Sequence, residues 1–173
     1  MKKQLLLLIA STLPCSAMAE WQSYDWNEAY TDAAASTYTS SDGISVEKFT
    51  SLAYIYSAYD RKQRIGFLAT AKQGEISLDM CNPSDFEKGP RTYSKEDIWN
   101  IDGQNVTMAV YCREEKSGSY SIDATPLTSA GERYILNTFR KNNFVWVESS
   151  FFTVKYSAKG FKSAWSNFGG DAL

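Results

Sequence analysis

Alternation of apolar side chains is the feature that most constrains the fold of this chain. Positions 106, 108, 110 and 112 are all apolar. They share one face if the segment is extended, because successive side chains of a β-strand point to opposite sides of the sheet. After a polar turn at 115–118, Tyr120, Ile122 and Ala124 repeat the pattern. The two segments are therefore predicted to pair as an antiparallel hairpin.

The same pattern predicts further strands. It occurs at 65–71 and at 76–80, on either side of a turn at 72–74, which indicates another hairpin. Segments 144–147 and 152–156 are also predicted strands. Residues 46–59 fit both helical and strand spacing, and the β-prone triplet Tyr54-Ile55-Tyr56 favours a strand followed by a polar turn at 60–63.

Two helices are expected near the C-terminus. Residues 129–132 match the capping-box pattern, and the apolar run behind them ends at the basic pair Arg140 and Lys141. A helical stripe that meets two glycines indicates a terminal amphipathic helix packed on the core. The stripe consists of Phe161, Ala164, Trp165 and Phe168.

These elements predict a mainly β fold, a β-sandwich or curved antiparallel sheet, with two short helices near the C-terminus. Residues 44–173 are expected to form one domain. Residues 20–43 are expected to form an N-terminal arm rich in aromatic residues. These aromatic side chains either lie on the main body or form a patch for a partner.

The first nineteen residues match a secretory signal peptide. Lys2 and Lys3 precede an apolar run at 5–10, and Ala17-Met18-Ala19 has the small-x-small pattern of a cleavage site. We therefore expect cleavage after Ala19, a mature protein that is periplasmic or secreted, and no membrane span.

Three cysteines are present, and Cys15 falls in the predicted signal peptide. Pro14 directly before Cys15 disfavours a lipoprotein site. In an oxidising compartment, Cys81 and Cys112 are predicted to form one disulfide. A metal or redox pair is the alternative. It is disfavoured because the spacing is not C-x-x-C and the chain has no histidine.

The absence of histidine excludes Ser-His-Asp and Cys-His catalysis and histidine-based zinc sites. We therefore expect no enzyme, no metal site and no cofactor. The chain carries 18 basic and 20 acidic residues, and loss of Lys2 and Lys3 would change its net charge from −2 to −4. A mildly acidic surface argues against nucleic acid or anionic lipid as a partner.

Two patterns that could carry chemistry are interpreted as chance matches or surface charges. Ser45 and Lys48 match S-x-x-K, and 116–118 resembles K-T-G, but the chain is too short for the acyltransferases that use these motifs. A carboxylate group for glycoside cleavage would need Asp60, Glu75 and Asp79 to meet across the 65–80 hairpin. The turn beside them is basic and is expected to face water or to bind an acidic partner. Its cations are Arg61, Lys62 and Arg64.

The C-terminal third resembles the invasion-associated locus B family of small exported bacterial proteins and, more loosely, accessory proteins of type VI secretion. The likeness lies in a late strand that runs into Ser157-Ala158-Lys159-Gly160-Phe161 and a closing helix with Ala164. It implies an exported, β-rich, non-catalytic protein and identifies no catalytic residue. The chain departs from the first family in having fewer cysteines.

The sequence thus favours an exported bacterial protein that works by protein–protein contact. Its most concrete form is an inhibitor or immunity protein that occludes a cell-envelope hydrolase, with the Pro- and Gly-containing loop 82–94 as the contact. The alternative is an accessory component of an envelope or secretion assembly that binds through the aromatic arm. A carboxylate-based hydrolase is the third hypothesis. The candidate partner-binding residues are Asp85, Phe86, Glu87, Lys88 and Arg91 in the loop, and Trp21 and Trp26, with Tyr24, in the arm.

Overall fold

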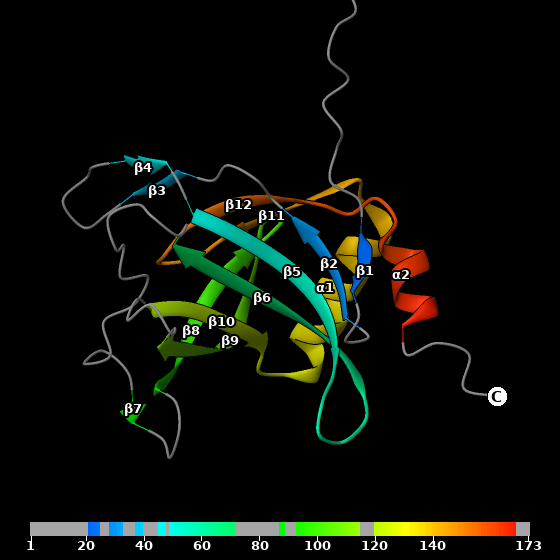
Figure 1. Ribbon diagram of the computed structural model, residues 1–173, viewed down its shortest axis with the longest axis horizontal. Coiled ribbons are helices and arrows are strands. Elements are labelled where there is room, and N and C mark those ends of the chain that lie inside the picture. The colour runs from blue at the N-terminus through cyan, green and yellow to red at the C-terminus, as the bar shows by residue number, and fades with distance from the viewer. Residues whose placement is uncertain are drawn as a thin grey trace, which may run out of the picture.

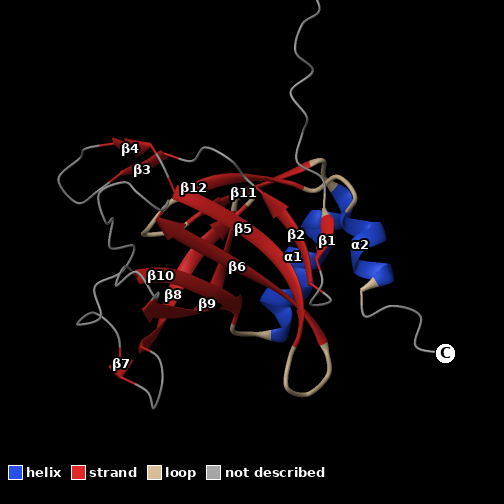
Figure 2. Ribbon diagram, in the orientation of Figure 1, coloured by secondary structure: helices blue, strands red, loops and turns tan. Residues whose placement is uncertain are grey.

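The fold is dominated by one strongly curved antiparallel sheet, with two helices near the C-terminus (Figures 1 and 2). The computed structural model describes residues 21–24, 28–32, 37–39, 45–47, 49–71, 87–88, 93–114 and 120–168. In these residues, nine strands follow the order β1-β2-β5-β6-β10-β9-β8-β11-β12, and β7 pairs with β8. A separate pair, β3 and β4, forms a small second sheet.

The elements have the following bounds: β1 Gln22–Tyr24, β2 Glu28–Asp32, β3 Thr37–Thr39, β4 Ser45–Glu47, β5 Phe49–Ser57, β6 Gln63–Ala71, β7 Glu87–Lys88, β8 Tyr93–Ile101, β9 Gln104–Glu114, β10 Tyr120–Pro126, α1 Ser129–Lys141, β11 Phe144–Glu148, β12 Thr153–Ser157 and α2 Phe161–Asn167.

Curvature brings the last strand of the sheet back to the first ones, so the sheet nearly closes as a barrel. β12 lies against β2 and β5 without pairing with either in the described ladders. Across this seam the buried hydroxyl of Tyr156 on β12 is hydrogen-bonded to the Ser51 hydroxyl on β5, and Ser51 also donates to the Leu68 carbonyl at 3.1 Å. Of the two predicted architectures, the curved sheet is therefore the correct one.

One side of the sheet supplies the core. Alternate residues of β9 are buried as predicted. In β10, Ile122 and Ala124 belong to the core as predicted, but Ser121 and Asp123 on the other face are buried as well. The two strands pair as a hairpin, with Ile122 opposite Cys112. Helix α1 packs its apolar side, including Ile135 and Phe139, against the same core. Alternation therefore determined which side chains face inward, because each strand keeps a period of two.

The hairpin predicted from 65–71 and 76–80 is wrong. β6 pairs along its whole length with β5, and at Phe67–Leu68–Ala69 its other edge pairs with β10. A strand has only two edges, so none is left at these residues for 76–80, which lie outside the described residues. The ambiguous segment 46–59 is strand β5 over Phe49–Ser57.

The predicted loop 82–94 contains strand structure at its end. Tyr93 and Ser94 begin the nine-residue strand β8, and β7 pairs with them. Alternation is hidden in β8 because two inward positions carry charges. Lys95 lies over the Phe151 ring, 4.8 Å from its centroid, and Asp97 accepts hydrogen bonds from Trp99 Nε1 at 3.1 Å and Ser150 Oγ at 2.8 Å.

The boundary placed between an N-terminal arm and a domain at residue 44 is also wrong. β1 and β2 belong to the main sheet, and β2 pairs with β5. Trp21 is buried, its ring meets Phe139 and Phe161 edge to face, and its Nε1 donates to the Ser157 carbonyl at 3.0 Å.

Both predicted helices are confirmed, with one change at the start of α1. Thr128, not Ser129, is the N-cap, and its hydroxyl accepts a hydrogen bond from the Gly131 amide at 3.0 Å. Helix α2 begins after Gly160, which adopts a left-handed conformation with φ of 79°. The predicted apolar stripe of α2 packs on the core, as expected.

Candidate binding surface

A protruding turn between β5 and β6 has a defined conformation (Figure 1). The Ala58 amide donates to the Lys62 carbonyl at 2.9 Å, and the Arg61 amide donates to the Ala58 carbonyl at 2.8 Å. Arg61 adopts a positive φ of 60°. This conformation is uncommon for a residue other than glycine and is held here by the surrounding bonds. We call residues 58–62 the hairpin tip.

Asp60 fixes the tip from within. Its carboxylate accepts hydrogen bonds from the Lys62 amide and from Arg64 Nη2, each at 3.1 Å. The bond from the Lys62 backbone, and then that from Arg64, hold the pKa of Asp60 below its ordinary value. Arg64 also lies 3.6 Å from the Glu132 carboxylate, so it ties the tip to helix α1.

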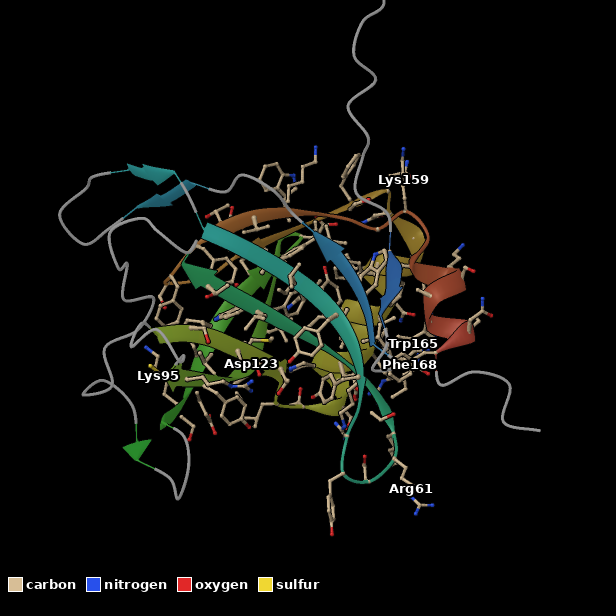
Figure 3. The ribbon with its side chains drawn as sticks, in the orientation of Figure 1. Arg61, Lys95, Asp123, Lys159, Trp165 and Phe168 are labelled. Carbon is tan, nitrogen blue, oxygen red and sulfur yellow. The ribbon has the colours of Figure 1, made fainter. Side chains whose placement is uncertain are left out.

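With Asp60 and Arg64 engaged, the tip presents other side chains to solvent. Tyr59 is fully exposed, and Arg61 and Lys62 are exposed beside it. In Figure 3, Arg61 points away from the body of the protein. An aromatic ring and two cations on a fixed turn form a contact surface with little conformational entropy left to lose in the backbone.

Beyond the tip, the outer face of β5, β6, β9 and β10 carries a polar network. Tyr54 donates to Asp123 Oδ1 at 2.6 Å, and Arg113 donates to Asp123 Oδ2 at 2.6 Å. Asp123 is nearly buried, at the position labelled in Figure 3. The Tyr54 ring lies over Gly66, where an added Cβ would be 2.7 Å from Tyr54 Cζ, so only glycine leaves room for this ring.

Burial controls the protonation of the two tyrosines in this network. Burial, followed by the charge and hydrogen bond of Asp123, raises the pKa of Tyr54 above its ordinary range. Burial likewise raises the pKa of Tyr56, whose ring lies 5.5 Å from that of Tyr54. Both hydroxyls therefore stay protonated near neutral pH, and both oxygens of Asp123 already accept a hydrogen bond. We call Tyr54, Tyr56, Arg64, Arg113 and Asp123 the outer strip.

Several predicted site residues fall elsewhere. Trp21 is buried, so it is wrong as a partner-binding residue, and the alternative that it packs on the main body is correct. Glu87 and Lys88 form β7 and pair with Ser94 and Tyr93 of β8. Asp85, Phe86, Arg91 and Trp26 lie outside the described residues.

The remaining candidates are placed only in part. Cys112 is buried on β9, and Cys81 lies outside the described residues, so their disulfide stays a prediction. Of the three candidate carboxylates, Asp60 lies in the hairpin tip and accepts a hydrogen bond from the Lys62 amide, and residues 75 and 79 lie outside the described residues. Ser45 begins β4, while 48 and 116–118 also lie outside the described residues.

Sequence reasoning identified Arg61, Lys62 and Arg64 but missed Tyr59 and the rest of the outer strip. The sequence carries two signals for the strip. Tyr54 and Tyr56 share one face of a strand, and Arg113 and Asp123 lie on the two strands of one hairpin. Their meeting depends on the β5–β6–β10–β9 order, which no spacing in the sequence predicts.

Comparisons with known proteins add no further constraint: no protein-family model, curated protein or solved structure matches this chain. In the described part of the chain, neither helix has the length and apolar character needed to cross a membrane.

Proposed function

We propose that this is an exported bacterial protein that binds another protein, and that the hairpin tip is its contact. The observation that carries this proposal is the fully exposed Tyr59 on a turn fixed by Asp60. Tyrosine and arginine are the residue types that most often dominate interface energies, and a preorganised loop loses little entropy on binding. The predicted signal peptide supports export, with cleavage after Ala19 and a periplasmic or secreted mature protein.

In its finer form, the proposal is an inhibitor or immunity protein against a cell-envelope hydrolase. Enzyme sites are concave, and a narrow protruding turn fits such a cleft better than a flat sheet does. Arg61 and Lys62 would then face acidic groups of the hydrolase. The loop 82–94 remains a second proposed contact of the same kind. An assembly role through the aromatic arm loses support because Trp21 is buried.

The test uses the mature, oxidised protein as bait in envelope extract, together with purified hydrolases assayed on cell wall. We expect one stoichiometric hydrolase to be retained and inhibited. A Tyr59→Ala/Lys62→Ala variant removes two exposed side chains and leaves the Asp60–Arg64 bond in place. Loss of one interface tyrosine alone costs about 2 kcal/mol, or roughly thirtyfold in affinity.

The matched control is Ile98→Ala/Arg133→Ala, which removes one exposed apolar residue and one exposed cation elsewhere. It should bind the hydrolase as the unchanged protein does. Equal binding by the tip variant would remove the tip from the contact, and retention of several assembly components without a hydrolase would favour the accessory role.

A further inference from the structure

Positive charge is concentrated at one end of the molecule although the whole chain is acidic. Residues 140–162 contain five basic residues and one acidic residue, a formal charge of +4, whereas the full chain has −2. All five cations are exposed. We call them the basic cap: Arg140, Lys141, Lys155, Lys159 and Lys162.

The fold gathers the basic cap where α1 ends, β11 begins, β12 ends and α2 begins. The Ala158 amide donates to the Asn143 carbonyl at 2.9 Å, which brings the neighbourhoods of Lys141 and Lys159 together. The Arg140 guanidinium lies over the Trp165 ring of α2 at 5.6 Å, so α1 and α2 join the same end. Figure 3 shows Lys159 pointing outward at the opposite end of the view from Arg61.

Aromatic rings lie among these cations. On the outer face of β11 and β12, Lys155 Nζ is 4.3 Å from the centre of the Phe144 ring and 5.5 Å from that of Trp146. Trp146 remains 48% exposed. Two described acidic residues lie near these rings: Glu148, on the outward side of β11 with Phe144 and Trp146, and Asp102. The Asp102 carboxylate accepts hydrogen bonds from Asn142 Nδ2 at 2.6 Å and from the Trp146 amide at 3.4 Å.

We infer that the basic cap, with Phe144 and Trp146, is a docking surface for an anionic phospholipid membrane. Four of its five cations are lysines, whose flexible point charges suit a fluid array of phosphates better than a fixed pair of acidic side chains. Tryptophan and lysine together favour the water–lipid interface, where the ring lies at headgroup level and the ammonium group stays in water. A segregated charge allows adsorption that the net charge of the whole chain argues against.

The basic cap and the hairpin tip are separate surfaces. With the basic cap on the membrane, the tip would point away from it, because Arg61 lies at the opposite end of the view in Figure 3 from Lys159. The mature protein can therefore be tested for lipid binding without knowledge of any protein partner.

The experiment is co-sedimentation of the mature protein with vesicles of phosphatidylcholine alone, or of phosphatidylcholine and phosphatidylglycerol in equal parts. We expect binding only to the anionic vesicles and a decline as salt rises, because ions screen exposed charges over about 10 Å at 0.1 M. Tryptophan emission should shift to shorter wavelength on binding, and comparison with Trp146→Ala isolates the contribution of that ring.

Charge removal gives the decisive comparison. The Lys141→Gln/Lys155→Gln/Lys159→Gln variant should bind anionic vesicles about a hundredfold more weakly, since each cation near an anionic surface contributes roughly fivefold in affinity. The control Arg61→Gln/Lys62→Gln/Arg133→Gln removes three exposed cations elsewhere and should bind as the unchanged protein does. Circular dichroism checks that both variants fold.

Three results would overturn the inference. They are equal binding to both kinds of vesicle, equal loss of binding in the two triple variants, and no vesicle binding at low salt. A further result would assign the basic cap to acidic proteins instead. In that case the unchanged protein would not bind vesicles but would bind an acidic protein, and the Lys141→Gln/Lys155→Gln/Lys159→Gln variant would bind neither.

Discussion

At the scale of single residues, the outer strip shows how one glycine and one carboxylate determine a surface. Gly66 leaves space for the Tyr54 ring, and Asp123 accepts one hydrogen bond from the Tyr54 hydroxyl and one from Arg113. A nearly buried carboxylate with two donors is stabilised, and it is costly to deprive it of either one.

Tyr54→Phe tests this network through pH. At neutral pH the variant should lose about 1–3 kcal/mol of unfolding free energy, because Asp123 loses one donor. Above pH 10 an unfolded tyrosine ionises at its ordinary pKa of about 10, whereas Tyr54 stays protonated in the fold because its pKa is raised. The unfolded state then binds fewer protons than the native state, so stability falls as pH rises.

The measurement is urea unfolding of both proteins from pH 7 to above pH 10. Tyr54 should contribute a slope of about −1.4 kcal/mol per pH unit above pH 10, and this contribution is absent in Tyr54→Phe. The stability gap between the two proteins should therefore narrow at high pH. A constant gap would contradict the raised pKa of Tyr54.

At the scale of elements, the neighbours of a segment in the sheet determine whether it forms a strand, and with which partner, more than its own residue propensities do. The alternation of β6 predicted pairing with residues 76–80, but its partners are β5, with which it forms the hairpin that ends in the tip, and β10. β8 is a full strand even though charges interrupt its pattern. It pairs with β9 over its whole length, and Asp97 finds donors in Trp99 and Ser150. Pairing on both edges and satisfied polar groups therefore outweigh the local pattern.

The start of α1 gives a prediction at this scale. Thr128→Ala should destabilise the protein by about 1 kcal/mol, because its hydroxyl caps the Gly131 amide. Ser129→Ala should have an effect near zero, since Ser129 is already the first helical residue and is exposed. Thermal and urea unfolding of both variants checks this. A larger loss in Ser129→Ala would restore the cap predicted from the capping-box pattern.

At the scale of the whole molecule, the seam between β12 and β5 holds the curved sheet nearly closed. Tyr156 and Ser51 bond across it, and Trp21 packs beside it on Phe139 and Phe161. Trp21, which directly precedes β1, therefore packs against both helices at this end of the sheet.

The predicted disulfide is tested at the same scale. A bond between Cys81 and Cys112 would close a loop of about 30 residues and contribute roughly 3–4 kcal/mol on the chain-entropy model. Non-reducing peptide mapping of the mature protein should recover the two cysteines in one cross-linked fragment, and reduction should lower stability by that amount. Cys81→Ala is the control, because reduction should no longer change its stability. Two alkylatable thiols in the oxidised protein would contradict the prediction.

The sequence by itself determined the mainly β class, the inward residues of β9 and β10, and both helices. Each of these depends on a local period of two or 3.6 residues that the chain carries in its own order. Only the tertiary structure decided the partners of β6, the strand β8, the burial of Trp21, and the gathering of the outer strip and the basic cap. Except for the basic cap, whose cations lie within residues 140–162, these features depend on contacts between segments that the local pattern does not specify, and their energy comes from pairing and packing that exist only once the sheet has curved.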